Sequence, residues 1–189
     1  EADGDVAQVG FGDASAGSES VFATASATLG TIVYDSSNDK IVVFFDRASQ
    51  LRARVGTVSG DSISFGTEVT VVARSVTYVS ATFDTSANKI LVAYNNNSSN
   101  NDYGEIRAGT VSGTDISFGT AVTFNSNTTH EIGVAFDSNI NRSLVAYRNS
   151  SNDGKAQAAT ISGTDVQMGN RSGFDNDTAY SIAVAYDAN

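Results

Sequence analysis

The sequence predicts an all-β protein, a β-propeller built from four-stranded antiparallel blades of about 50 residues each. Three observations carry this prediction. The 189-residue chain repeats itself, each repeat contains four segments of strand character, and no stretch has the 3.6-residue apolar period of an amphipathic helix. Propellers generally close with four to eight blades, so three full repeats predict an incomplete set of blades.

The repeat is visible in landmarks that return in the same order. Gly56-Thr-Val-Ser-Gly60 recurs at 109–113 and, as Ala-Thr-Ile-Ser-Gly, at 159–163. An Ile/Val-rich run that ends in an aromatic residue and Asp occurs four times, ending at Asp35, Asp84, Asp137 and Asp187. We therefore place blades at 28–75, 76–128 and 129–178, with 179–189 as the first strand of a further blade.

Residues 1–27 depart from the repeat and form an acidic segment rich in Ala, Gly and Ser. Within it, residues 6–12 match the outer strand of a preceding blade, because Phe11-Gly12 stands 54 residues before Phe65-Gly66. The chain therefore reads either as part of a longer propeller or as a set of blades that closes with copies of itself.

The first two strands of each unit, such as 31–35 and 41–45, are continuous apolar runs, which predicts burial on both faces. Crowding around a central channel would explain small residues in the first strand, namely Gly30, Ser80, Gly133 and Ala183. The third strand alternates around Arg52 and Arg54, as in a strand with two different faces. The fourth, 62–71, passes a glycine that predicts a bulge or bend.

Composition excludes several function classes. The chain has no Cys, which excludes disulfides, zinc–thiolate sites and a cysteine nucleophile, and its one histidine, His130, excludes paired-histidine metal sites. The formal net charge of −10 argues against nucleic-acid binding. No run reaches the 18 apolar residues of a membrane helix, so membrane insertion is not expected. We expect no cofactor and no metal.

The recurring Asp35, Asp84, Asp137 and Asp187 could be acid–base carboxylates, but a residue that recurs once per blade is more typical of an Asx turn. The segments that follow them resemble calcium loops only superficially. Position six of an EF-hand loop is Gly, whereas Lys40, Lys89 or Arg142 stands there. His130 reads as a loop or strand-end residue rather than a general base. No catalytic residue is predicted.

The loops after the second strand vary most between units, and variable loops on a rigid scaffold are where binding residues concentrate. Their Asn, Ser and Tyr side chains can hydrogen-bond and stack on sugars, and they are also ordinary turn residues. The candidate ligand-binding residues are Asn97, Asn101, Tyr103, Asn149 and Asn152. Several Asn-x-Ser/Thr triplets, expected by chance in so Asn-rich a chain, would be glycosylation sites in a secreted eukaryotic protein.

The sequence pattern at 56–67 and 109–120, together with the two apolar runs of each unit, resembles propeller-type repeats of tail-fibre and other structural proteins of marine bacteriophages. Similar repeats occur in surface proteins of marine bacteria. The resemblance implies a non-enzymatic structural or host-recognition module, extracellular on a virion or cell surface. Its partners would be other proteins of the fibre, cell-surface glycans or further copies of itself. A sialidase-like enzyme and a purely architectural spacer are the alternatives.

Overall fold

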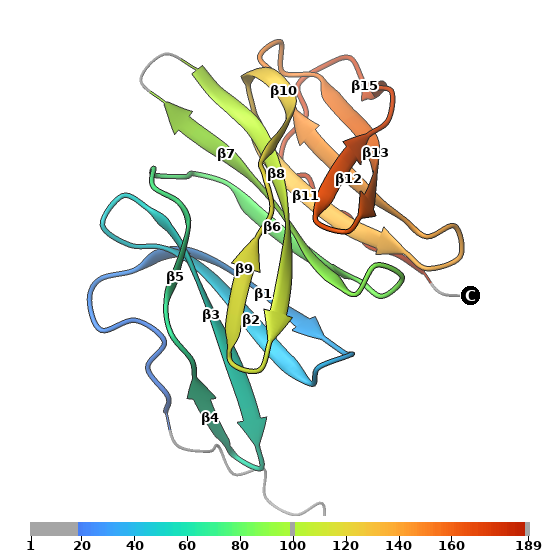
Figure 1. Ribbon diagram of the computed structural model, residues 1–189. Helices are drawn as coiled ribbons and strands as arrows, with labels where there is room; N and C mark the ends of the chain where they lie inside the picture. Colours follow the sequence, from blue (N-terminus) through green and yellow to red (C-terminus); the bar gives the residue numbers. More distant parts are fainter. Residues whose placement is uncertain (1–18, 99–100, 188–189) are drawn as a thin grey trace, which may run out of the picture.

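The computed structural model describes residues 19–98 and 101–187, and within them it contains β-strands and no helix (Figure 1). No described segment could therefore cross a membrane as a helix. The proposed outer strand at residues 6–12 lies outside the described residues.

The strands form three sheets, each from one stretch of the chain. The first contains β1 (Thr28–Asp35), β2 (Lys40–Asp46), β3 (Leu51–Ser59), β4 (Ser62–Phe65) and β5 (Val69–Val72). The second contains β6 (Val79–Asp84), β7 (Lys89–Ser98), β8 (Asn101–Ser112), β9 (Asp115–Phe118) and β10 (Val122–Thr128). The third contains β11 (His130–Asp137), β12 (Arg142–Arg148), β13 (Gly154–Ser162), β14 (Asp165–Met168) and β15 (Ser172–Asp175).

Each sheet is an antiparallel meander, and the three sheets follow one another like blades around an axis (Figure 1). The first strands β1, β6 and β11 are neighbours, with β6 in contact with both others. The backbone nitrogen of Val134 on β11 donates to Ser80 Oγ on β6 across 3.1 Å. This arrangement confirms the all-β, blade-type propeller fold expected from the repeat.

The hydrophobic core lies between the sheets rather than within any one of them. We call the face that a sheet turns toward the following sheet its rear face, and the opposite one its front face. Val42, Phe44 and Val55 on the rear of the first sheet pack with Ile90 and Val92 on the front of the second. The rear of the second sheet packs with the front of the third in the same way. Each blade therefore depends on its neighbour for burial of apolar area.

The expectation that the first two strands are buried on both faces is correct for β2 and wrong for β1. Residues 42–45 of β2 are all buried. On β1, Val33 is buried but Ile32 and Tyr34 are exposed. They lie on the front face of the first sheet, where the described chain places no blade, whereas Phe83, the counterpart of Tyr34, is buried against the first sheet.

The small residue predicted at Gly30 is misplaced by one position. Thr31 pairs with Phe44 at the level where Ser80 pairs with Ala93 and Gly133 with Ala146. Gly30 stands five positions before Asp35, whereas Ser80 and Gly133 each stand four positions before the aspartate of their strand. Close approach nevertheless explains Gly133: a Cβ there would stand 3.1 Å from Val184 Cγ2.

The predicted first strand of a further blade is not a hydrogen-bonded strand in the structure. Residues 182–187 belong to no hydrogen-bonded ladder, although Val184 lies against Gly133 as a neighbouring inner strand would. Residues 182–187 form no ladder because the described chain contains no second strand for this segment to pair with.

The predicted glycine bend in the fourth strand is real and divides the strand in two. β4 pairs with the second half of β3 and β5 with its first half, and Gly66 lies between them. A Cβ at Gly66 would collide with the carbonyl oxygen of Thr114, and one at Gly119 with that of Thr164. Each of these threonines lies in the third-to-fourth-strand hairpin of the next blade. The glycines therefore let adjacent blades approach closely.

We predict that Gly119→Ala lowers the free energy of unfolding by about 1–3 kcal/mol, as expected for overpacking. Besides the carbonyl collision, its Cβ would stand 2.8 Å from Thr164 Cβ, so two blades would have to separate. Gly169→Ala at the equivalent position of the third sheet is the matched control, because its nearest neighbour would be the Ala158 carbonyl oxygen at 3.4 Å. Urea denaturation measures both, and equal losses would contradict the prediction.

Candidate functional site

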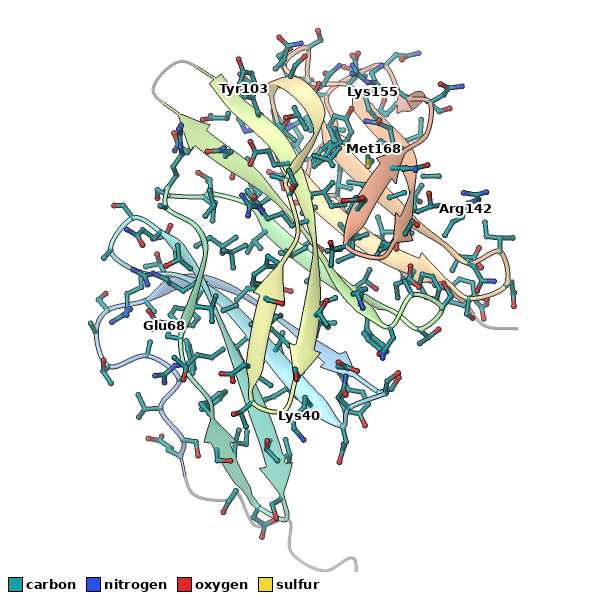
Figure 2. The ribbon with its side chains drawn as sticks, in the orientation of Figure 1. Lys40, Glu68, Tyr103, Arg142, Lys155 and Met168 are labelled. Atoms are coloured by element: carbon teal, nitrogen blue, oxygen red, sulfur yellow. The ribbon has the colours of Figure 1, made fainter. Side chains whose placement is uncertain are left out.

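The loops between second and third strands and the linkers between blades gather at one end of the molecule. Figure 2 shows Tyr103 and Lys155 at this end, and Lys40 and Arg142 near the hairpins that join first and second strands. The linkers are tied to the loops through the backbone: Thr129 N donates to Asp102 O, and Ala179 N to Asn152 O, each at 2.9 Å. We call this end the loop face.

Buried polar side chains fix the first linker on the loop face. Oδ2 of Asp46 accepts from Ser75 Oγ and from the Val76 backbone, both at 3.1 Å. Oδ1 of Asn95 accepts from the backbone nitrogens of Thr77 and Tyr78, at 2.7 and 2.8 Å. Because Asp46 and Asn95 are buried, these bonds replace hydration and hold the linker in one conformation.

Aromatic rings and one guanidinium come together where the linkers enter the inner strands. The rings of Tyr78 and His130 meet edge-to-face, with centroids 5.7 Å apart and planes at 88°. His130 pairs with Arg148 across β11 and β12, and the Arg148 guanidinium carbon lies 5.5 Å from the centroid of the Tyr180 ring. We call these four residues the aromatic–arginine cluster. Tyr180 is 72% exposed, so one side of the cluster faces solvent.

Burial lowers the pKa of His130 below its ordinary value, and the positive charge of Arg148 lowers it further. Asp102 and Glu131 act in the opposite direction. His130 is therefore neutral at pH 7, and Arg148 supplies the positive charge of the cluster. Such a set offers ring faces for stacking and a planar cation that binds carboxylate or sulfate groups through paired hydrogen bonds.

The structure separates the loop residues predicted from the sequence into two kinds. Asn149 builds its own loop, because its Oδ1 accepts from the backbone nitrogens of Ser151 and Asp153, both at 2.9 Å. Asn152 is exposed, and its Oδ1 accepts from Arg148 Nη1, so it adjoins the aromatic–arginine cluster.

Three predicted residues lie on the longer loop of the second sheet. Asn97 is exposed on β7, and its backbone nitrogen donates to Ser75 O of the linker at 3.3 Å. Tyr103 is half-buried on β8, where it pairs with Thr128 of β10. Asn101 begins β8, and its side chain is outside what the structure describes.

Sequence reasoning treated His130 as incidental and missed Tyr78, Arg148 and Tyr180. A signal was present: a ring-bearing residue stands where each linker meets the inner segment that follows it, at Tyr78, His130 and Tyr180. The sequence did not indicate that Arg148 pairs with His130, because this pairing depends on the irregular register between His130 and Gly133.

Three of the four recurring aspartates, Asp35, Asp84 and Asp137, form Asx turns as predicted. Oδ1 of Asp35 accepts from the backbone nitrogens of Ser37 and Asn38, at 3.0 and 3.1 Å. Asp84 and Asp137 repeat the pattern in their own blades. Residues four positions later take positive φ of 51–54°, at Asp39, Asn88 and Asn141. These carboxylates therefore cap hairpins at the end of the molecule opposite the loop face.

Basic residues on the third strands, and Arg47 just before β3, bind separate partners. Glu68 forms ion pairs with Arg47 and Arg52. Arg107 Nε donates to the buried Tyr94 hydroxyl at 2.9 Å. Lys155 pairs with Asp153 at 2.9 Å. These cations lie with partners of their own sheet and do not assemble into one cluster.

No family model and no curated protein matches the chain. Among solved structures, the chain is similar to a protein from Lactobacillus plantarum determined as a structural-genomics target, with a TM-score of 0.52 and 12% sequence identity. The alignment covers 74% of this chain and 40% of that protein, so the chain spans less than half of its neighbour's length. At this identity the similarity concerns the fold alone.

Removing the Asp84 carboxylate should destabilise the fold. We predict that Asp84→Ala costs about 1–3 kcal/mol of unfolding free energy, because two backbone amides and the Ser86 hydroxyl lose their acceptor at a buried position. Asp84→Asn keeps an acceptor oxygen and should cost less than half as much. Chemical denaturation of both variants is the measurement, and an equal loss in the two would refute the turn role.

The single histidine gives a clean pH test. We predict an NMR titration midpoint for His130 below its ordinary pKa of 6.5, and an upward shift in Arg148→Met, since removal of the guanidinium removes one cause of the lowering. Because the folded-state pKa is the lower one, the stability contributed by neutral His130 is complete above pH 6.5 and declines as the pH falls through the folded value. A midpoint at or above 6.5 would contradict the assignment.

Proposed function

We propose that the chain is a non-enzymatic binding module that recognises glycans bearing carboxylate or sulfate groups through its loop face. The observation that carries the proposal is the aromatic–arginine cluster. It combines exposed ring surface on Tyr180 with the planar cation of Arg148, and the amide of Asn152 lies beside them. Sugars stack their C–H faces on aromatic rings, and arginine distinguishes acidic sugars from neutral ones.

Rigidity supports the same proposal. The linker leading to Tyr78 is fixed by Asp46 and Asn95, and the linker leading to Tyr180 is bonded to the Asn152 carbonyl. Because these residues are ordered before a ligand arrives, binding costs less conformational entropy than it would on a free loop. A net charge of −10 would repel polyanions in general, so an acidic glycan has to be recognised locally at Arg148.

The setting that we propose is an extracellular one, on a virion fibre or a cell surface, in agreement with the resemblance of the repeat to tail-fibre proteins. Other structural proteins of the fibre would be partners away from the loop face. An architectural role is the second candidate. It is favoured by the exposed apolar residues Ile32 and Tyr34 on the front face of the first sheet.

The test is binding to a panel of sialylated, sulfated and neutral glycans. We predict that Arg148→Ala weakens binding of acidic glycans about 10-fold or more, as expected for loss of a charged hydrogen bond. Tyr180→Ala should weaken acidic and neutral glycans alike. Arg142→Ala and Tyr34→Ala are matched controls, because both side chains are exposed near the opposite hairpins and should leave binding unchanged.

Two results would overturn the glycan proposal. The first is absence of binding to every glycan of the panel by a protein whose folding is verified by circular dichroism. The second is an equal loss of binding in the Arg142→Ala and Arg148→Ala proteins. Either result would leave the architectural role as the better account.

A further inference from the structure

The rear face of the third sheet is apolar and only partly covered. It is formed by Leu144, Ala146, Ala156, Ala158 and Phe174. Leu144 is 41% exposed, whereas its counterparts Val42 and Leu91 on the first two sheets are fully buried.

Phe174 differs from its counterparts in the same way. It is 58% exposed, whereas Phe124, at the equivalent place on the second sheet, is 4% exposed. A hollow of about 810 Å³ lies over this face, and residues 178–185 form its other wall. The chemistry of the face is that of a blade interface, and in the described chain no blade covers it.

The two complete interfaces define what packs on a rear face. In both, the front face of the next blade supplies the apolar contacts, and the hairpin between its third and fourth strands reaches the glycine of the preceding outer strand. Thr114 thus reaches Gly66, and Thr164 reaches Gly119. Gly169 is the third member of this series, and the three atoms nearest to a Cβ there all belong to Ala158 in its own sheet.

The innermost position beside the third sheet is already occupied. Val184 stands against Gly133, and the Tyr186 hydroxyl lies 3.4 Å from Ser138 Oγ. A second copy of the chain would bring its own β1 to this place and would compete with residues 182–187. A blade that uses residues 182–187 as its first strand avoids that conflict.

We propose that the rear face of the third sheet is the docking surface for a fourth four-stranded blade of the same repeat in the same polypeptide. Residues 182–187 are its innermost strand, its front face covers Leu144 and Phe174, and its third-to-fourth-strand hairpin rests on Gly169. The proposal concerns assembly of the fold and stands or falls independently of glycan binding.

The test extends the full chain by one blade. Asp187 occupies the same place in the repeat as Asp137, so replacing the last two residues by a copy of residues 138–175 supplies the second, third and fourth strands in register. We expect amide hydrogen exchange of residues 182–186 and 143–146 to slow at least about 10-fold relative to the 189-residue chain. The binding of an apolar fluorescent dye should fall at the same time.

Gly169→Ala is the matched control. In the 189-residue chain it should leave stability unchanged, and in the extended chain it should abolish most of the added exchange protection, as Gly119→Ala does at the existing interface. Unprotected appended strands, or added protection that survives Gly169→Ala, would overturn the proposal.

Sedimentation of the unextended chain gives a second, independent result. A concentration-dependent oligomer that Leu144→Asp dissociates would identify the occupant as another copy of the chain and would also overturn the proposal. A monomer whose stability Leu144→Asp leaves unchanged supports it, because a free rear face tolerates a charged side chain.

Discussion

A four-stranded antiparallel sheet whose two faces are both apolar cannot be stable in water by itself, and this constraint governs the molecule. Its core is held in the spaces between successive sheets, where Phe44 of one blade and Val92 of the next exclude water together. Close approach of the sheets then requires glycine at Gly66 and Gly119. The spacing of these glycines along the chain is thus a property of the interfaces, since each one lies where the next blade's hairpin arrives.

The same constraint determines where polar chemistry can occur. Polar groups can be buried between sheets only when they are hydrogen-bonded. Gln157 is an example, because its Nε2 donates to the Phe124 carbonyl at 2.9 Å and to the Tyr147 hydroxyl at 3.0 Å. Burial raises the pKa of the Tyr94 hydroxyl, which accepts a hydrogen bond from Arg107 and stays neutral. Polar groups of the interior therefore serve packing, and ligand chemistry is left to the ends of the strands.

Local signals in the sequence were sufficient to predict the turns. An Asp and a residue of positive φ four positions later specify the hairpin between the first and second strands of each blade. The glycine of the Ser-Gly pair, such as Gly60 or Gly113, specifies the hairpin between the third and fourth strands. Only the Gly of that two-residue turn has positive φ, which is the requirement of a type II′ turn. Such features are read correctly because every residue that makes the turn lies within a few positions of the others.

Features that depend on neighbouring blades could not be predicted from the sequence of a single repeat. Ile32 is exposed because the described chain places no blade in front of it. The sequence of an apolar strand does not show whether a neighbouring blade covers it. Nothing in the spacing of the loops indicated that Asn149 would bond to its own backbone while Asn152 would reach Arg148.

The position that ends the second strand shows how a repeat acquires a local function. Asp46 and Asn95 stand there in the first two blades, and both accept hydrogen bonds from amides of the same linker. In the third blade the position is Arg148, which cannot accept and instead donates to Asn152 and lies over Tyr180. A substitution that exchanges an acceptor for a donor removes a structural bond and creates a cation with solvent access. Departures from the repeat of this kind, rather than the repeated residues themselves, are where recognition can be specific to one blade.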